Sequence, residues 1–256
     1  MCNMFGKTAY RILNISRPRF WMYVLGSYLI GIGAASSLSE AVLFNPNIIW
    51  WLVFFTLPAN LFVYGINDLA DNDTDEFNPK KGTYEEKVDS KDKRLVIISM
   101  LALNLPFLFL LKSSSQTEII LFSIFVLFNI FYSLPPIRLK AIPFLDSISN
   151  GIICAAVGMM GYASAGGNNF LVSGILAGAL WSIAMHAYSA IPDIESDKKA
   201  GIKTIATVLG DKNTIWLCVL IYTSIIILFT TNSLSIFTIL VFPYLILMCL
   251  SFKNLR

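Results

Sequence analysis

The chain of 256 residues is long enough for one or two soluble domains, but its composition is that of a membrane protein. Hydrophobic residues make up 56% and charged residues only 14%, with a mean hydropathy of +0.68, whereas soluble proteins carry about 25% charged residues. The net charge of +3 arises from loops between apolar stretches, so it gives no indication of nucleic-acid binding.

Eight mainly apolar stretches follow one another along the chain, and a membrane helix requires about 20 such residues. They predict an all-α, polytopic transmembrane helical bundle that forms one domain over residues 1–256. Gly and Pro interrupt several stretches, so tilted or broken helices are expected. The predicted spans are Phe20–Ala35, Ile48–Ile66, Leu95–Leu111, Glu118–Leu134, Phe144–Ala163, Phe170–Ile191, Thr214–Thr230 and Leu234–Ser251.

The basic residues test this number of spans, because the loops between eight spans alternate between the two sides of the membrane. One side receives 18 of the 19 Lys and Arg residues, and the other side receives only Lys112. The positive-inside rule assigns the basic side to the cytoplasm. We therefore expect both termini and the two long loops on the cytoplasmic face of a bacterial or archaeal inner membrane.

The first apolar stretch has a basic flank but no small-residue cleavage site after it, so we expect a retained helix and no cleaved signal peptide. The cysteines show no metal-binding or redox spacing. Three of them lie in predicted spans, where they are expected to be small packing residues. The four cysteines are Cys2, Cys154, Cys218 and Cys249.

Two long loops each begin with a cluster of carboxylates. "NDLADNDTD", residues 67–75, follows the second span, and "PDIESDKKAGIKT", residues 192–204, follows the sixth. Carboxylates this close together require cations, and Mg²⁺ prefers oxygen ligands and is often shared with substrate phosphates. Steps of three or four residues, which share one face of a helix, relate Asn67, Asp68, Asp71 and Asp75 in the first cluster and Asp193 and Asp197 in the second.

The first cluster also imitates a calcium site, because Asp71-x-Asp73-x-Asp75 is the beginning of an EF-hand pattern. An EF-hand loop needs Gly at its sixth position and Glu at its twelfth. This chain has Glu76 and Gly82 at those positions, so the calcium hypothesis fails on both.

Basic side chains flank both clusters and would suit a diphosphate ligand. Juxtamembrane Lys and Arg commonly do nothing beyond fixing topology, and this alternative stays open for each lysine. Arg138 and Lys140 in "YSLPPIRLK" are stronger candidates, because a double proline makes a rigid turn that holds them in place. The other candidates are Lys80, Lys81, Lys198, Lys199 and Lys203.

Three segments carry a resemblance to a known family. "NDLADNDTD" matches the NDxxDxxxD pattern of the UbiA superfamily of intramembrane prenyltransferases, and "DIESDKKAGIKTIATVLG" resembles the second aspartate motif of that superfamily. "YSLPPIRLK" is similar to its tyrosine–serine–basic segment, and the motif order fits over nearly the whole chain. The resemblance implies Mg²⁺-dependent transfer of a prenyl group from an allylic isoprenoid diphosphate to a lipophilic acceptor.

The resemblance also implies roles for individual residues. Magnesium would be bound by five aspartates: Asp68, Asp71, Asp75, Asp193 and Asp197. Asn67 would assist them in binding the diphosphate, whereas Asp73 and Glu195 lie off the motif positions. The diphosphate and the nascent cation would be flanked by Tyr132, Ser133, Arg138, Lys140 and Lys198. The residues expected to carry catalysis are Asp68, Asp71, Asp193, Tyr132 and Arg138.

Aromatic residues would supply the apolar part of such a site. They serve either as interface and packing residues or as rings that shield an allyl cation, and the sequence does not separate the two roles. The neighbourhood of Tyr132 favours the second role for that residue. The other candidates are Trp21, Tyr23, Tyr28, Tyr64, Trp181 and Tyr188.

Finer features resemble the lycopene-elongase branch, which prenylates the ends of carotenoids. These features are "SRPRFWMYVLGSYLIG", "NPKKG" and "MHAYSAIPDIESDKKAGIKT", and "EFNPKKGTYEEK" replaces the arginine-rich segment typical of aromatic-acid prenyltransferases and haem O synthases. A carotenoid such as lycopene is therefore the expected acceptor, and quinone precursors and lipid glycerol ethers are the alternatives. His186, the only histidine, is either a proton acceptor or a packed hydrogen-bonding residue.

One departure from the family and one alternative class of protein must be weighed against this interpretation. The family generally has nine spans, whereas the sequence predicts eight, with two after the second motif in place of three. A membrane transporter or ion-binding protein also uses acidic residues, but such sites usually lie near the bilayer midplane. The clusters in this chain lie at span ends beside basic residues, which favours a phosphorylated substrate. The sequence leaves the oligomeric state open.

Overall fold

The computed structural model describes residues 2–35, 42, 44–71, 85–89, 91–168, 172–232 and 235–254. The secondary-structure elements in these ranges are helices, which confirms the predicted all-α class. The chain divides into two compact units. The first comprises Met1–Pro136 and Ala156–Asn169, and the second comprises Ile137–Ala155 and Phe170–Arg256. The expectation of a single domain over residues 1–256 stays a prediction.

Six helical segments among the described residues are long and apolar enough to cross a membrane. They correspond to the second, third, fourth, sixth, seventh and eighth predicted spans. The first and fifth predicted spans correspond to α2 (Trp21–Ala34) and α8 (Leu145–Ser164), so the expectation of about eight spans fits. The six segments are Pro46–Ala70, Lys93–Lys112, Gln116–Ser133, Val172–Lys199, Ile205–Thr231 and Ile236–Lys253.

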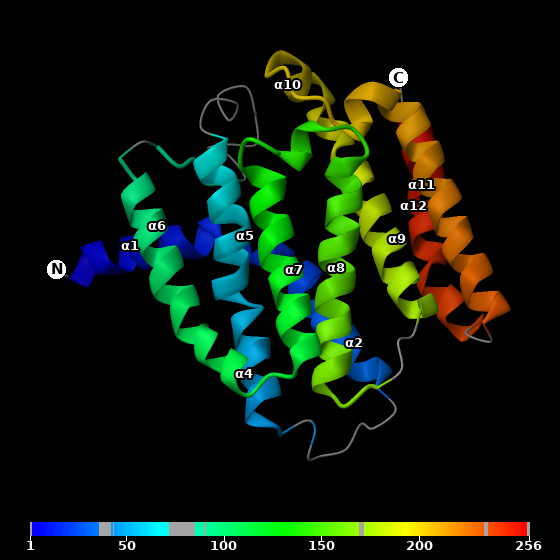
Figure 1. Cartoon of the computed structure of the whole chain (residues 1–256). Helices are drawn as coiled ribbons and strands as arrows, with labels where there is room; N and C mark the ends of the chain where they lie inside the picture. Colours follow the sequence, from blue (N-terminus) through cyan, green and yellow to red (C-terminus); the bar gives the residue numbers. More distant parts are fainter. Residues whose placement is uncertain are drawn as a thin grey trace. The chain divides into compact units, whose positions relative to one another are not determined.

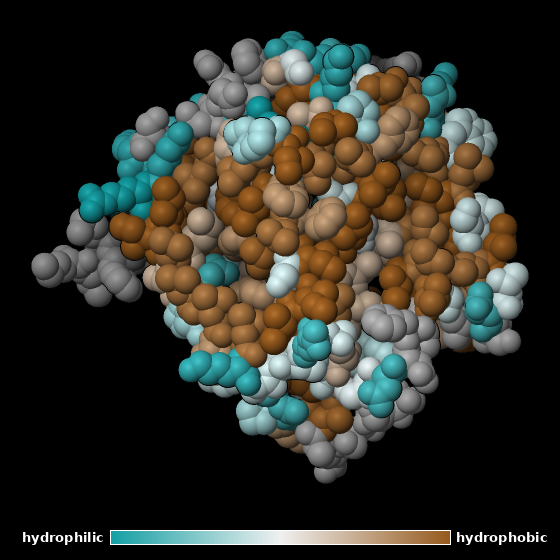
Figure 2. Space-filling view, viewed as in Figure 1, coloured by the Kyte–Doolittle hydropathy of each residue, from teal (hydrophilic) through white to brown (hydrophobic). Residues whose placement is uncertain are grey.

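Large apolar side chains are exposed along these helices, including Ile30 (74%), Leu220 (62%) and Leu240 (66%). On the face shown in Figure 2, hydrophobic residues cover the middle of the helices and hydrophilic residues gather toward their ends. Soluble monomers rarely expose contiguous apolar surface on this scale. A surface of this kind is solvated by lipid, so the chain is an integral membrane protein.

The first unit begins with a helix that the sequence analysis did not predict, α1 (Cys2–Ile15), which runs crosswise to α5 and α6 (Figure 1). Its Ile12 and Ile15 are buried against Leu61 and Val96, whereas Tyr10 is exposed, so the helix is amphipathic. The elements that follow in this unit are η1 (Pro18–Phe20), α2, α4 (Pro46–Phe54), α5 (Leu57–Ala70), α6 (Lys93–Asn104), η3 (Leu105–Lys112), α7 (Gln116–Ser133) and the end of α8.

A proline breaks the second span, as the sequence predicted. Helix α4 ends at Phe54 and α5 begins at Leu57, with Pro58 in its first turn. The side-chain amide of Asn60 donates to the carbonyls of the two residues between the helices, at 3.0 Å to Phe55 and 2.7 Å to Thr56. The amide of Asn104, at the end of α6, donates to the Pro58 carbonyl at 3.0 Å. Lipid offers no water to carbonyls freed by a break, so side-chain amides satisfy them instead.

Helix α2 and the end of α8 cross at backbone contact distance in the first unit. A Cβ atom at Gly31 would lie 1.8 Å from the carbonyl oxygen of Gly158, and one at Gly161 would lie 2.1 Å from that of Tyr28. Membrane helices use small residues for such close approach, because van der Waals packing replaces the hydrophobic driving force in lipid.

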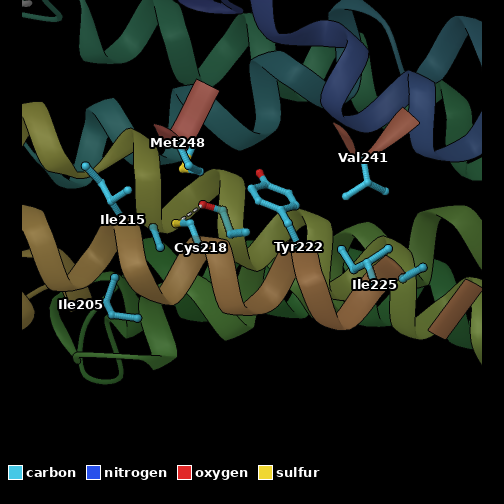
Figure 3. Packing of buried hydrophobic residues seen from close by; sticks show 10 residues of the cluster. Ile205, Ile215, Cys218, Tyr222, Ile225, Val241 and Met248 are labelled. Carbon is cyan, nitrogen blue, oxygen red and sulfur yellow. Dashed lines mark hydrogen bonds between the residues drawn. The ribbon is translucent and has the colours of Figure 1, made fainter. Parts of the chain in front are cut away.

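The core of the second unit surrounds α11, which packs against α9 and α12. Figure 3 shows Ile215, Cys218 and Tyr222 of α11 facing Met248 of α12, and the Cys218 thiol donates to the Ala184 carbonyl at 3.3 Å. Cys218 is thus a packing residue, as predicted. The elements of this unit are η4 (Leu139–Ala141), the first part of α8, α9 (Val172–Ser189), η5 (Ile191–Asp193), α10 (Ile194–Lys199), α11 (Ile205–Thr231), η6 (Ser235–Leu240) and α12 (Phe242–Asn254).

Helix α11 bends at Gly210, whose φ of 75° and ψ of 172° lie outside the helical region. Glycine adopts this conformation without a steric cost, because it has no Cβ atom. The hydroxyl of Thr214 donates to the Gly210 carbonyl at 2.6 Å and so satisfies a group that the bend affects. The first turn of α11 therefore has a direction of its own.

Substitution of Gly31 by Ala tests the crossing of α2 and α8. The added methyl group meets backbone, which cannot rotate away, so we expect Gly31→Ala to destabilise the protein by about 1–3 kcal/mol, the usual cost of overpacking. Gly33→Ala, on the same helix with nothing within 4 Å of the new methyl group, is the matched control. Equal thermal midpoints of the two variants in detergent would contradict the crossing.

Candidate active site

The first acidic cluster lies at the end of α5 in the first unit. Asn67 and Asp68 belong to its last turn, and the N–H of Asp71 donates to the Asn67 carbonyl at 3.0 Å, so Asp71 closes the helix. Asn67 and Asp71 are half-buried, whereas Asp68 is only 1% exposed. Asp75, together with Lys80 and Lys81, lies outside the described residues, so the predicted step from Asp71 to Asp75 is not tested.

Arg17 holds Asp68, a contact that the sequence analysis missed. Its Nη2 atom lies 2.8 Å from Oδ1 of Asp68 and 3.0 Å from Oε2 of Glu85. The same guanidinium stacks over the ring of Tyr64, 4.6 Å from its centroid. Arg19 binds the other oxygen of Glu85 at 3.1 Å. Two arginines and two carboxylates thus form one charge-balanced group around the end of α5.

The backbone and the charges around Arg17 act together. Burial lowers the pKa of the Arg17 guanidinium, but the ion pairs with Asp68 and Glu85 more than offset this and raise the pKa above its usual range. The residue has φ of 51°, a left-handed conformation that costs a non-glycine residue roughly 1–2 kcal/mol. The ion pairs stabilise this turn, which ends α1 immediately before Pro18.

A second arginine of the N-terminal segment anchors the same region. Arg11, in α1, binds Glu86 at 3.1 Å and Asp92 at 2.7 Å and donates to the Lys87 carbonyl at 3.1 Å. Val88 packs beside α1 in the same hydrophobic cluster as Ile12 and Ile15. Residues 86–88 and Asp92, which precede α6, are therefore attached to α1 by both charge and apolar contact.

The predicted residues between the two motifs fall in different units. Tyr132 and Ser133 are the last residues of α7 in the first unit, and Ser133 is buried. Arg138 and Lys140 belong to the second unit, where Arg138 precedes η4 with φ of 45° and Lys140 is buried. The double proline lies between these two pairs in the sequence.

The second acidic cluster lies in the second unit, directly after α9. Asp193 ends η5 and occupies the residue before α10, and Asp197 lies four residues later within α10. Their common role in binding Mg²⁺ stays a prediction. The hydroxyl of Thr204 lies 3.4 Å from Oδ2 of Asp197. Lys198 is exposed, and its Nζ lies 3.7 Å from a carboxylate oxygen of Glu195.

A buried carboxylate that the sequence analysis overlooked holds the start of α11, directly after the second acidic segment (residues 192–204). Asp146, at the start of α8, is fully buried, and its Oδ2 accepts from the N–H of Ile205 at 2.9 Å. Thr204 caps the same helix start, since its hydroxyl accepts from the N–H of Thr207 at 3.2 Å. An acidic residue inside an apolar stretch was the available signal, because such residues are rarely incidental.

His186 belongs to a hydrogen-bonded seam between α8 and α9. Its Nδ1 lies 3.1 Å from the hydroxyl of Ser147, and the Ser182 hydroxyl donates to the Asn150 carbonyl at 3.1 Å one turn away. A Cβ atom at Gly151 would lie 3.0 Å from the Ala179 carbonyl, so the two helices approach closely. His186 is thus a packed, hydrogen-bonded residue, and its role as a proton acceptor stays a prediction.

Several of the aromatic candidates have contacts of their own. The ring of Tyr28 lies 5.0 Å from that of Phe55, and the ring of Trp181 lies 6.1 Å from that of Tyr244. The Tyr188 hydroxyl bonds Ser251 at 2.7 Å. These contacts correspond to the packing role that the sequence left open.

The donor chemistry of the two clusters is uniform. Their side chains offer carboxylate and amide oxygens, the ligands that hard cations such as Mg²⁺ prefer. Within each unit, and among the residues that the structure describes, no three carboxylate, imidazole or thiolate side chains are grouped closely enough to hold a metal ion. Asp75 of the first cluster is not among those residues.

Lipid-solvated helices with an acidic cluster at the end of α5 and another after α9 define the class: a polytopic helical membrane protein with two carboxylate motifs at helix ends. The sequence matches the UbiA prenyltransferase family over residues 24–255. The chain belongs to this family and is a prenyltransferase, as the motif resemblance implied.

Similar proteins include three named lycopene elongase/hydratase. The chain is 41% identical to that of Haloarcula japonica over 209 residues, which cover 82% of this chain and 70% of the relative. It is 39% identical to that of Haloferax volcanii over 204 residues, covering 80% and 66% of the two chains. It is 31% identical to that of Corynebacterium glutamicum over 229 residues, covering 86% and 76%.

Solved structures share the fold. A UbiA homologue from Archaeoglobus fulgidus, bound to DMAPP and Mg²⁺, aligns with a TM-score of 0.76 at 21% identity, covering 94% of this chain and 86% of that one. A UbiA homologue from Aeropyrum pernix aligns with a TM-score of 0.66 at 14% identity, covering 96% and 90%. At these identities the likeness shows the fold alone, and it confirms the predicted fold class.

Replacement of Asp146 tests the buried cap of α11. Asp146→Ala removes the acceptor of the Ile205 N–H, so we expect the free energy of unfolding to fall by about 1 kcal/mol, the typical loss of a helix cap. Asp146→Asn keeps an acceptor oxygen and should lose less. Thermal melting in detergent measures both, with Lys212→Ala as the exposed control on the same helix. Equal thermal midpoints for Asp146→Ala and the control variant would show that Asp146 does not stabilise the start of α11.

Proposed function

We propose that this prenyltransferase extends a carotenoid, transferring a prenyl group from an allylic isoprenoid diphosphate to the end of lycopene. The observation that carries the proposal is the pair of acidic clusters, each at the end of a lipid-solvated helix and each beside basic residues. The elongase-like segments of the sequence and the names of the three relatives support a carotenoid acceptor. A lipid setting suits both substrates, since each is largely hydrocarbon.

The proposed site draws on both motifs. Asn67 and Asp71 of the first motif and Asp193 and Asp197 of the second would hold Mg²⁺ and the diphosphate, with Asp75 completing the first set. Asp68 differs from these, because Arg17 holds its carboxylate. The oxygen-only donor set fits Mg²⁺, and DMAPP and Mg²⁺ are bound in the structure of the Archaeoglobus fulgidus homologue. The positive-inside rule places both motifs on the cytoplasmic side.

When bound, Mg²⁺ would neutralise the charge that develops on the diphosphate leaving group. Arg138, Lys140 and Lys198 would add cationic side chains near that group, in the way that preorganised charges stabilise a transition state. Tyr132 and Ser133, at the end of α7, would flank the carbon from which the diphosphate departs. The apolar walls of the spans would exclude water from the allyl cation.

The acceptor supplies the electrons of the new bond. The C–O bond of the donor breaks, so that diphosphate leaves with the bonding electrons, and a terminal alkene of the carotenoid then attacks the allyl cation to form a C–C bond. The tertiary cation that remains on the product is quenched either by loss of a proton, which gives an alkene, or by addition of water and loss of its proton, which gives an alcohol.

Expression in a lycopene-producing host tests the acceptor. DMAPP, the diphosphate bound by the Archaeoglobus fulgidus homologue, carries five carbons, and with such a donor we expect pigments heavier than lycopene by one or two five-carbon units in mass analysis. A host that expresses the protein, supplies the donor and retains only unchanged lycopene would contradict the carotenoid assignment.

Single substitutions in each motif test the site in the same host or in purified membranes. Asp71→Ala and Asp193→Ala should each reduce prenyl transfer by at least about 100-fold, the range seen when one transition-state charge contact is lost. Asp211→Ala, an acidic residue of α11 outside both motifs, serves as the control and should retain activity. Full activity in either motif variant, with the protein present in the membrane, would refute the two-cluster site.

A further inference from the structure

We propose that Asp68 serves as the buried counter-ion of Arg17, and that this ion pair positions the end of α5, in place of a role for Asp68 as a ligand of Mg²⁺. The inference rests on the proposed function, because it divides the roles within the same site. It separates Asp68 from its neighbours Asn67 and Asp71, which the motif pattern treats alike.

Burial distinguishes Asp68 from both neighbours, and direction separates it from Asn67. Asp68 is 1% exposed, whereas Asn67 and Asp71 are half-buried. Consecutive residues of an α-helix point about 100° apart, so Asp68 and Asn67 face different directions. Tyr64 lies one turn before Asp68, and both residues contact the guanidinium of Arg17. The Asp68 side of α5 is thus occupied by Arg17.

The charges around Arg17 point the same way. Arg17 binds both Asp68 and Glu85, and Arg19 binds the second oxygen of Glu85. A divalent cation on Asp68 would share that carboxylate with a guanidinium 2.8 Å away, and like charges repel strongly where water is excluded. Asp71, which closes the helix, is the better placed ligand for an exchangeable cation.

The ion pairs define the geometry of the motif. Asp68 lies in the last turn of α5, between Asn67 and Asp71, and Glu85 is where the described chain resumes after Asp71. One guanidinium therefore ties the last turn of α5 to Glu85, a residue further along the chain. Arg17 acts through this position, so it is a positioning residue.

A rescue experiment separates the two roles of Asp68. Asp68→Asn removes a charge but keeps an acceptor, and Arg17 retains Glu85, so prenyl transfer should fall by less than about tenfold. Arg17→Gln removes one partner of the buried ion pair while Glu85 keeps Arg19, and the buried negative charge deprived of this guanidinium should reduce activity by more than about tenfold. The double variant Arg17→Gln/Asp68→Asn removes that charge and should regain most of the lost activity.

Two further measurements do not rest on the size of the activity: the thermal midpoint without substrates, and the Mg²⁺ concentration that gives half of each variant's own maximal activity. In detergent without Mg²⁺ or donor, the thermal midpoint should fall most in Arg17→Gln and rise again in the double variant, which is the coupling expected of a direct pair. The Mg²⁺ concentration for half-maximal activity should stay within about twofold of wild type in Asp68→Asn and rise in Asp71→Asn.

Arg19→Gln is the matched control, because Arg19 binds the same Glu85 but not Asp68 and is 46% exposed. It should lower the midpoint less than Arg17→Gln, and Asp68→Asn should not rescue it. The inference is overturned if Asp68→Asn is as inactive as Asp71→Asn and the double variant shows no recovery. Failure of the proposed function has a different signature, since the wild type would then transfer no prenyl group to lycopene while the stability coupling persists.

Discussion

Charge compensation at the ends of apolar helices is the constraint on which the rest of this molecule depends. A carboxylate at such an end is partly removed from water, and its charge must be balanced by a cation or by N–H donors. The structure shows both solutions. Arg17 balances Asp68 at the end of α5, and the N–H of Ile205 stabilises Asp146 at the start of α11. In each case the partner comes from a segment distant in sequence, so compensation also fixes tertiary structure.

The same principle applies to the uncharged backbone. Lipid cannot accept or donate hydrogen bonds, so a broken span is tolerated only where another group satisfies its carbonyls. Asn60 and Asn104 do so around Pro58, and Thr214 does so at Gly210. Polar residues inside the spans are therefore consequences of irregular helices as much as of chemistry. This explains why polar side chains of the described spans are not all candidates for the active site.

Much of the fold followed from the sequence because its signals are local. Apolar runs of membrane length and the placement of Lys and Arg predicted the spans, and the structure has helices at those positions. Helix α1 was not predicted, because fourteen residues with one apolar face are too short and too polar for a span. Its packing on Leu61 and Val96 depends on residues far along the chain.

The candidate site was predictable to a different extent. The spacing of Asp193 and Asp197 gave their common helix turn directly. The partner of Asp68 was not accessible in this way, because 51 residues separate it from Arg17 and nothing local marks the pair. In the sequence, Arg17 is one of the basic residues that set topology and part of the elongase-like segment that begins at Ser16, and neither fact identifies its partner. Spacing identifies residues that share a face, whereas burial decides which of them a substrate can reach.

Helix α11 illustrates how one backbone angle separates two tasks. Before Gly210, the first turn is held by Asp146 and lies beside Asp197, so polar contacts determine its direction. After Gly210, the helix is aligned by apolar packing of Cys218 and Tyr222. The bend at Gly210 thus divides α11 into a first turn that polar contacts orient and a longer part that apolar packing orients. Substitutions on the lipid-facing surface of α11 after Gly210 can therefore accumulate without reorienting the first turn. The position of the second motif is then independent of sequence change in the rest of the helix.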